Sequence, residues 1–155
     1  MQLTLMRHGI DTVSGHPRGL TSAGRAQVER ITMALAASGW RPASVVHSPL
    51  LRARETADVV LDCLGTLPRI ELEDVVGGNW KLLELMADLG LDDPLIIGHE
   101  PGISVLARRL VGAEGSLPFG RATVASFEVQ RLPPIAPATL RFFVPAALLD
   151  HTQAG

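Results

Sequence analysis

The chain alternates short apolar runs with segments of helical spacing, and this alternation limits the folds that it can adopt. Residues 3–7, 43–47 and 94–98 are runs rich in strand-forming residues, and each is followed by a segment with apolar residues three and four positions apart. Such alternation is typical of an α/β protein with a mostly parallel sheet covered on both faces. We therefore predict a three-layer αβα sandwich.

Local signals predict where the first helices begin and end. Thr21 is expected to cap a helix that ends at Gly39, and Gly24 on its apolar face is expected to allow close packing on the sheet. Ser48 and Pro49 follow the second apolar run directly. They are expected to be the N-cap and the first helical position of the next helix.

The end of the chain has a different character. Residues 123–129 and 139–144 have the composition of strands, and a proline-rich loop rather than a helix joins them. Two strands joined in this way predict an antiparallel C-terminal strand pair at one end of the sheet. A length of 155 residues without a repeat or a linker predicts one domain over residues 1–155.

Composition excludes several classes of function. A net charge of −2 gives no broad basic face for nucleic acid, and no apolar run is long enough to span a membrane. Cys63 is the only cysteine, so no disulfide can form within the chain, and no Cys/His pattern has metal-ligand spacing. We expect a cytoplasmic monomer that uses neither a metal nor a cofactor.

The residues that suggest chemistry follow the predicted strands. Arg7 and His8 end the first run, His99 ends the third, and Arg52 lies in the first turn of the helix after the second. Ligands of open α/β sheets bind at the carboxyl ends of the strands, so these side chains are expected to converge. A neutral imidazole can accept a phosphoryl group, and arginine forks match its oxygens.

The predicted site assigns a role to each residue. His8 is the nucleophile, and Arg7, Arg52 and His99 clamp the phosphoryl oxygens, with His99 protonated when phosphate is bound. Taken alone, either histidine could simply close a strand end, and either arginine could form a surface ion pair. His47 is interpreted as structural, a strand-end residue before the helix.

Four motifs in order resemble those of the histidine phosphatase superfamily. They are Arg7-His8-Gly9, Leu20-Thr21-x-x-Gly24, Ser48-Pro49-x-x-Arg52-Ala53-x-Glu55-Thr56-Ala57, and Gly98-His99 before a helix. Within the superfamily the short chain is most similar to the SixA-type phosphohistidine phosphatases. The resemblance implies a phosphoglycerate mutase-like fold and a phosphohistidine intermediate on His8. It also implies phosphate contacts from Arg7, Arg52 and His99, with Arg18 as a further candidate.

One position leaves the substrate open. Phosphomonoesterases and mutases of this superfamily use a carboxylic acid after the third strand, and Glu73 falls in that region without their surrounding pattern. We expect hydrolysis of phosphohistidine in a partner protein or in a small phosphorylated substrate. The alternatives are a small-molecule phosphomonoesterase or mutase with Glu73 as general acid, and an inactive phosphate- or phosphoprotein-binding module.

Overall fold

Six strands form one sheet in the computed structural model, which describes residues 1–115 and 117–153. The strands are β1 (Gln2–Arg7), β2 (Ser44–His47), β3 (Arg69–Glu71), β4 (Pro94–Gly98), β5 (Val124–Glu128) and β6 (Thr139–Val144). Their order is β3-β2-β4-β1-β5-β6. The first four in this order are parallel, whereas β5 is antiparallel to both β1 and β6. The predicted mostly parallel sheet and its antiparallel C-terminal pair are confirmed.

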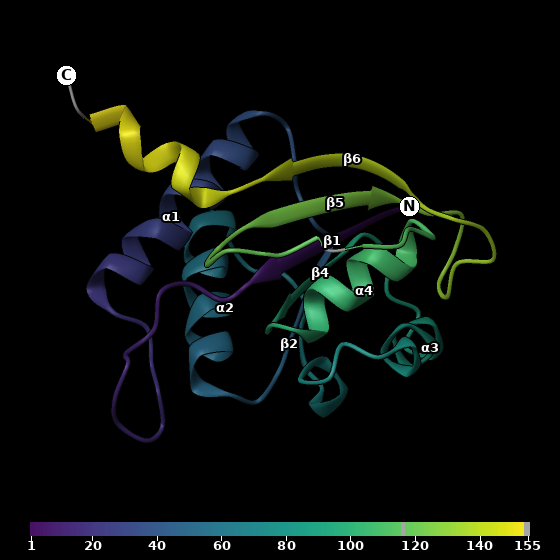
Figure 1. The fold of residues 1–155 in the computed structure, drawn as a ribbon, viewed down its shortest axis with the longest axis horizontal. Coiled ribbons are helices and arrows are strands. Elements are labelled where there is room, and N and C mark those ends of the chain that lie inside the picture. The colour runs from purple at the N-terminus through teal and green to yellow at the C-terminus, as the bar shows by residue number, and fades with distance from the viewer. Residues whose placement is uncertain (116, 154–155) are drawn as a thin grey trace.

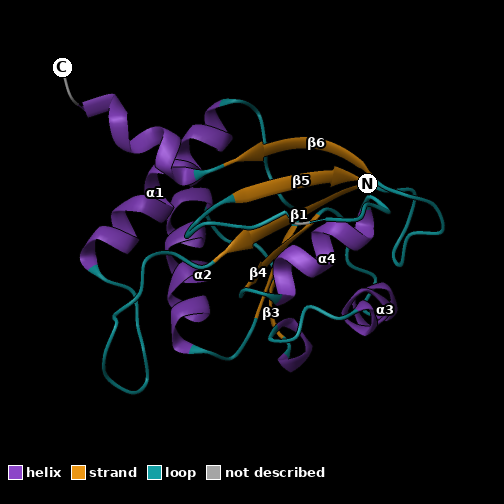
Figure 2. Cartoon of the chain, viewed as in Figure 1, coloured by secondary structure: helices purple, strands orange, loops and turns teal. Residues whose placement is uncertain are grey.

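Helices cover both faces of this sheet (Figure 1). They are α1 (Ser22–Ala37), α2 (Leu51–Leu64), α3 (Trp80–Asp88) and α4 (Gly102–Leu110), with two 3₁₀ helices, η1 (Glu73–Val75) and η2 (Ala146–Gln153). Buried side chains of α1 and α2 pack on one face, and those of α3 and α4 pack on the other. Figure 2 shows the strands between the two helical layers, which confirms the predicted αβα sandwich.

The first helix begins as predicted, but the role expected of its glycine differs. Thr21 caps α1, and its side chain accepts a hydrogen bond from the Gly24 amide at 2.9 Å. A Cβ atom on Gly24 would collide with the carbonyl of Ile10. Gly24 therefore allows the loop after β1 to approach the helix, whereas we expected it to contact the sheet.

The second helix does not begin as predicted. Leu50 precedes its first residue, Leu51, and no side chain caps it. The hydroxyl of Ser48 instead accepts a hydrogen bond from the Leu50 amide at 3.3 Å and bonds to His99. The prediction of Ser48 as N-cap was wrong because this side chain turns toward the neighbouring strand end.

The strand register aligns the ends of three parallel strands. Arg7 of β1 lies opposite Gly98 of β4, and His47 of β2 lies opposite Ile97 of β4. Because β5 runs in the opposite direction, its first residue lies at the same edge of the sheet, where Val124 pairs with Met6. This edge therefore brings together the residues that follow β1, β2 and β4 and those that precede β5.

No helix in the described residues is both long enough and apolar enough to cross a membrane.

Candidate active site

His8 lies at the end of β1 with one ring nitrogen held and the other available. Its amide donates to the carbonyl of Gly98 at 3.1 Å, and Nδ1 lies 2.8 Å from the carbonyl of Gly9. Since a carbonyl only accepts, Nδ1 carries the proton and Nε2 carries the lone pair. Nε2 makes no hydrogen bond with residues 1–115 or 117–153. Burial lowers the pKa of His8 to about 4, so the ring is neutral at pH 7.

The backbone after His8 is fastened to the first turns of α2. The Gly9 amide donates to the hydroxyl of Thr56 at 3.1 Å, and that hydroxyl donates to the carbonyl of Arg52 at 2.7 Å. A Cβ atom on Gly9 would lie 2.7 Å from Val28 of α1, so a side chain at this position would push α1 away. This linkage fixes Arg52 relative to the nucleophile candidate.

His99 follows β4 and lies beside His8, with the two ring centroids 5.2 Å apart. Its Nε2 is 2.5 Å from the hydroxyl of Ser48, while Nδ1 is buried and has no hydrogen-bond partner among the described residues. Burial, and to a lesser extent repulsion from a protonated His8, lowers the pKa of His99 to about 3, so the free protein holds it neutral at pH 7. A bound phosphate dianion would raise that pKa and so favour the protonated ring, which is the form that the clamp role requires.

Asp11 brings three arginines together next to these rings. Its carboxylate is 2% exposed; Oδ2 lies 2.5 Å from Nη2 of Arg18 and 3.9 Å from Nε of Arg52. Oδ1 accepts from Nε of Arg121 at 3.2 Å. Burial acts to raise the pKa of Asp11, but His8 and the hydrogen bonds from Arg121 and Arg18 bring it below its usual value. Asp11 is therefore ionised and orients the three guanidiniums.

Arg7 approaches the same cluster from the end of β1. Its Nη1 donates to the carbonyl of Phe119 at 2.7 Å, and its Nε is buried without a hydrogen-bond partner in the described residues. Burial lowers the pKa of Arg7, and the charges of the neighbouring Arg121 and Arg52 lower it further. The structure thus gathers all five predicted residues, His8, Arg7, Arg52, His99 and Arg18, into one cluster.

Glu73 begins a short helix, η1, that packs against the end of β4, where a Cβ atom on Gly98 would lie 3.4 Å from Val75. Its side chain is exposed and makes no hydrogen bond or ion pair with the rest of the described chain. The structure therefore does not bring Glu73 into contact with either of the two site histidines.

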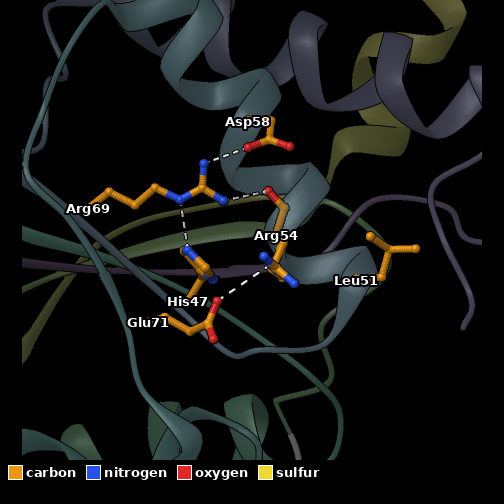
Figure 3. Close-up of a pocket in the computed structure, with 6 residues that line it drawn as sticks. All are labelled: His47, Leu51, Arg54, Asp58, Arg69 and Glu71. Atoms are coloured by element: carbon orange, nitrogen blue, oxygen red, sulfur yellow. Dashed lines mark hydrogen bonds and ion pairs between the residues drawn. The ribbon is translucent and has the colours of Figure 1, made fainter.

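A separate polar cavity of about 520 Å³ lies beside the cluster, between β2, β3 and α2 (Figure 3). Nε2 of His47 accepts a hydrogen bond from Nε of Arg69 at 2.9 Å, and its Nδ1 donates to the Ser48 carbonyl at 2.7 Å. Arg69 also pairs with Asp58, and Arg54 lies 3.5 Å from Glu71. Both nitrogens of His47 are occupied, which agrees with the structural interpretation.

Three residues of the site were missed by sequence reasoning: Ser48 as the partner of His99, Asp11 and Arg121. Asp11 stands in an irregular loop, where its isolated carboxylate gave no spacing to interpret. Arg121 precedes an antiparallel strand, so the rule that ligands bind at the carboxyl ends of parallel strands does not apply to it. The predicted strand reversal was the available signal, because the start of an antiparallel strand lies at that same edge.

Comparisons with known proteins agree with this architecture. The profile of the family described as "Histidine phosphatase superfamily (branch 1)" matches residues 3–89. The chain is 30% identical over 135 residues to the phosphohistidine phosphatase SixA of Escherichia coli (strain K12), an alignment that covers 81% of this chain and 84% of that protein.

Solved structures resemble it over nearly their whole length. The protein histidine phosphatase SixA complexed with tungstate superposes with a TM-score of 0.85 at 25% identity, covering 96% of this chain and 99% of the other. The alpha-ribazole phosphatase of Shigella flexneri superposes with a TM-score of 0.70 at 20% identity, covering 94% and 97%. The second likeness shows the shared fold only.

Proposed function

Because the chain belongs to the histidine phosphatase superfamily (branch 1), we propose that it hydrolyses phosphohistidine through a phosphoryl group held transiently on His8. The observation that carries this proposal is the state of His8: a buried neutral imidazole beside several guanidiniums, whose Nε2 lone pair has no partner in residues 1–115 and 117–153. We further propose that residues 1–155 act as a single domain.

The reaction would proceed in two transfers. The Nε2 lone pair of His8 attacks phosphorus, a new P–N bond forms, and the substrate P–N bond breaks. The departing imidazole keeps the electron pair and takes a proton from solvent. Water then attacks phosphorus, a P–O bond forms, the pair of the broken P–N bond returns to His8, and a proton is released to solvent.

The clamp residues would stabilise both transfers electrostatically. We assign Arg7 and Arg52 to the phosphoryl oxygens, with Arg18 beside them and His99 as a donor from the opposite side. In the protonated state Nε2 of His99 would donate to the hydroxyl of Ser48, and the buried Nδ1 would be the donor to the phosphoryl group.

The environment of Glu73 favours phosphohistidine over phosphate esters. General-acid assistance typically contributes about 100- to 10,000-fold, and an alkoxide needs it more than an imidazole does. The exposed side chain of Glu73 makes no hydrogen bond or ion pair with the site residues of the described chain. We therefore propose that the leaving group departs without it. For an inactive binding module a free nucleophile would serve no purpose.

Turnover of a phosphohistidine peptide should be compared with that of an alkyl phosphate, for the wild type and for Glu73→Gln. We expect the peptide to be much the better substrate, with turnover changed less than about twofold by the substitution. High wild-type activity on the alkyl phosphate, abolished by Glu73→Gln, would instead establish a phosphomonoesterase.

A further inference from the structure

Arg121 is an additional cation of the site to which the proposed mechanism gives no role. Its Nε and Nη2 both lie 3.2 Å from Oδ1 of Asp11. The other oxygen of this carboxylate faces Arg18 and Arg52. Arg121 is therefore held in the cluster around His8 by the carboxylate that also pairs with Arg18 and Arg52.

The backbone around Arg121 is joined directly to the strand that carries the nucleophile candidate. The amide of Ala122 donates to the carbonyl of His8 at 3.1 Å, and the carbonyl of Thr123 accepts from the amide of Arg7 at 3.1 Å. Ala122 has φ +54°, a left-handed conformation that is unfavourable for a residue with a side chain. The turn that presents Arg121 is thus fixed next to His8 rather than free to move.

Arg121 presents unused hydrogen-bond donors to solvent. Its side chain is 39% exposed, as is that of Arg18, whereas that of Arg52 is 21% exposed. A guanidinium has five N–H bonds, of which Arg121 directs two at Asp11, and its side chain makes no other hydrogen bond or ion pair with the described residues. Arg18 and Arg121 therefore form the outer edge of the site.

The outer edge of the site keeps positive charge when a phosphoryl group is bound. Arg18, Arg52 and Arg121 surround the single carboxylate of Asp11. Glu100 interacts electrostatically with Arg7 and accepts from the Ser104 amide at 3.1 Å. A phosphoryl dianion held by Arg7 and Arg52 would therefore leave Arg18 and Arg121 with only the charge of Asp11 between them.

We propose that Arg121, with Arg18 beside it, binds a second anionic group of the substrate, a carboxylate that flanks the phosphohistidine in a protein or peptide. The inference rests on the proposed function and adds a preference for an acidic sequence around the target. A planar guanidinium can hold such a carboxylate through two parallel hydrogen bonds. Arg121 is in this sense a specificity-determining residue, whereas the phosphoryl transfer itself needs only the inner groups.

The test compares two phosphohistidine peptides, one with aspartates and one with alanines on either side of the target, for the wild type and for Arg121→Ala. We expect the wild type to have a higher kcat/KM for the acidic peptide, and the substitution to lower that value about tenfold. Turnover of the alanine peptide should fall less, so that the ratio of the two kcat/KM values drops toward one. The preference should also weaken as salt is raised.

Two further variants distinguish loss of the Arg121 charge from a disturbance of the surrounding structure. Arg121→Gln keeps an N–H donor for Asp11 but loses the charge, and it should also lose the acidic preference. Arg141→Ala is the matched control: it removes one arginine, 55% exposed and paired with Glu128 at 3.1 Å on the β5–β6 pair, and should keep the preference.

The outcomes separate the inference from the proposed function. Equal wild-type turnover of the two peptides, or an equal loss on both in Arg121→Gln, would overturn the role of Arg121 while phosphohistidine hydrolysis stands. If the wild type turned over neither peptide, both the role of Arg121 and the proposed function would be overturned.

Discussion

His8 and His47 both lie at the carboxyl ends of parallel strands, β1 and β2, which flank β4, yet only one of them is suited to react. In both, Nδ1 donates to the carbonyl of the following residue, at 2.8 Å and 2.7 Å, and burial lowers the pKa of both. They differ at Nε2, which in His47 accepts from Arg69 and in His8 is free among the described residues. A strand-end histidine thus becomes a nucleophile candidate only when its second nitrogen is left without a partner.

The number of carboxylates that balance the neighbouring arginines also differs between the two histidines. Beside His47, Arg54 and Arg69 each have a carboxylate of their own, Glu71 and Asp58 (Figure 3). Beside His8, three arginines share Asp11. The cavity at His47 is therefore balanced in charge, whereas the site at His8 attracts an anion.

The largest expected effect comes from removing each histidine in turn. His8→Ala should lower phosphohistidine turnover by at least about 1,000-fold, because the covalent route is lost. His47→Ala should leave turnover intact and cost about 1–2 kcal/mol of unfolding free energy, since Arg69 loses its acceptor. Steady-state kinetics and urea denaturation of both variants would check this. Similar losses of turnover would end the distinction between the two sites.

A smaller effect is expected from two arginines of α2. Arg52 belongs to the site at His8, and Arg54 lines the cavity at His47. Arg52→Lys keeps the charge but loses the planar fork, and should lower kcat/KM about 100-fold. Arg54→Lys, in the exposed pair with Glu71, should change kcat/KM less than about twofold and stability by about 0–1 kcal/mol. If Arg52→Lys were as active as Arg54→Lys, the clamp assignment would be wrong.

The smallest effect concerns the stability of the protein as a function of pH. The pKa of His8 falls from 6.5 in the unfolded chain to about 4 in the fold, so on acidification the unfolded chain binds its proton first. The stability present above pH 6.5 is then lost as the pH falls toward 4, by about 2 kcal/mol at pH 5 from His8 alone. Urea denaturation at pH 7 and pH 5 should show a smaller difference for His8→Asn than for the wild type. An identical difference would show that His8 is not held neutral by burial.

Sequence reasoning reached the layers of the fold and the convergence of the site because both follow from local periodicity and strand direction. Arg7, His8 and His99 lie at strand ends, and the rule for parallel sheets places such residues together. It did not reach Asp11 or Arg121, whose roles depend on contacts across 110 positions of the chain. It also assigned Ser48 to a helix cap, since nothing local indicates that its hydroxyl turns to His99 51 positions away.

The central claim is that His8, and not His47, carries the phosphoryl group. The most direct measurement is a brief incubation with labelled phosphohistidine peptide, quenched in alkali, followed by digestion and mapping of the label. The account predicts an alkali-stable, acid-labile label on the peptide that contains His8 and none on the peptide that contains His47. Label on the His47 peptide, or full turnover by His8→Ala, would contradict it.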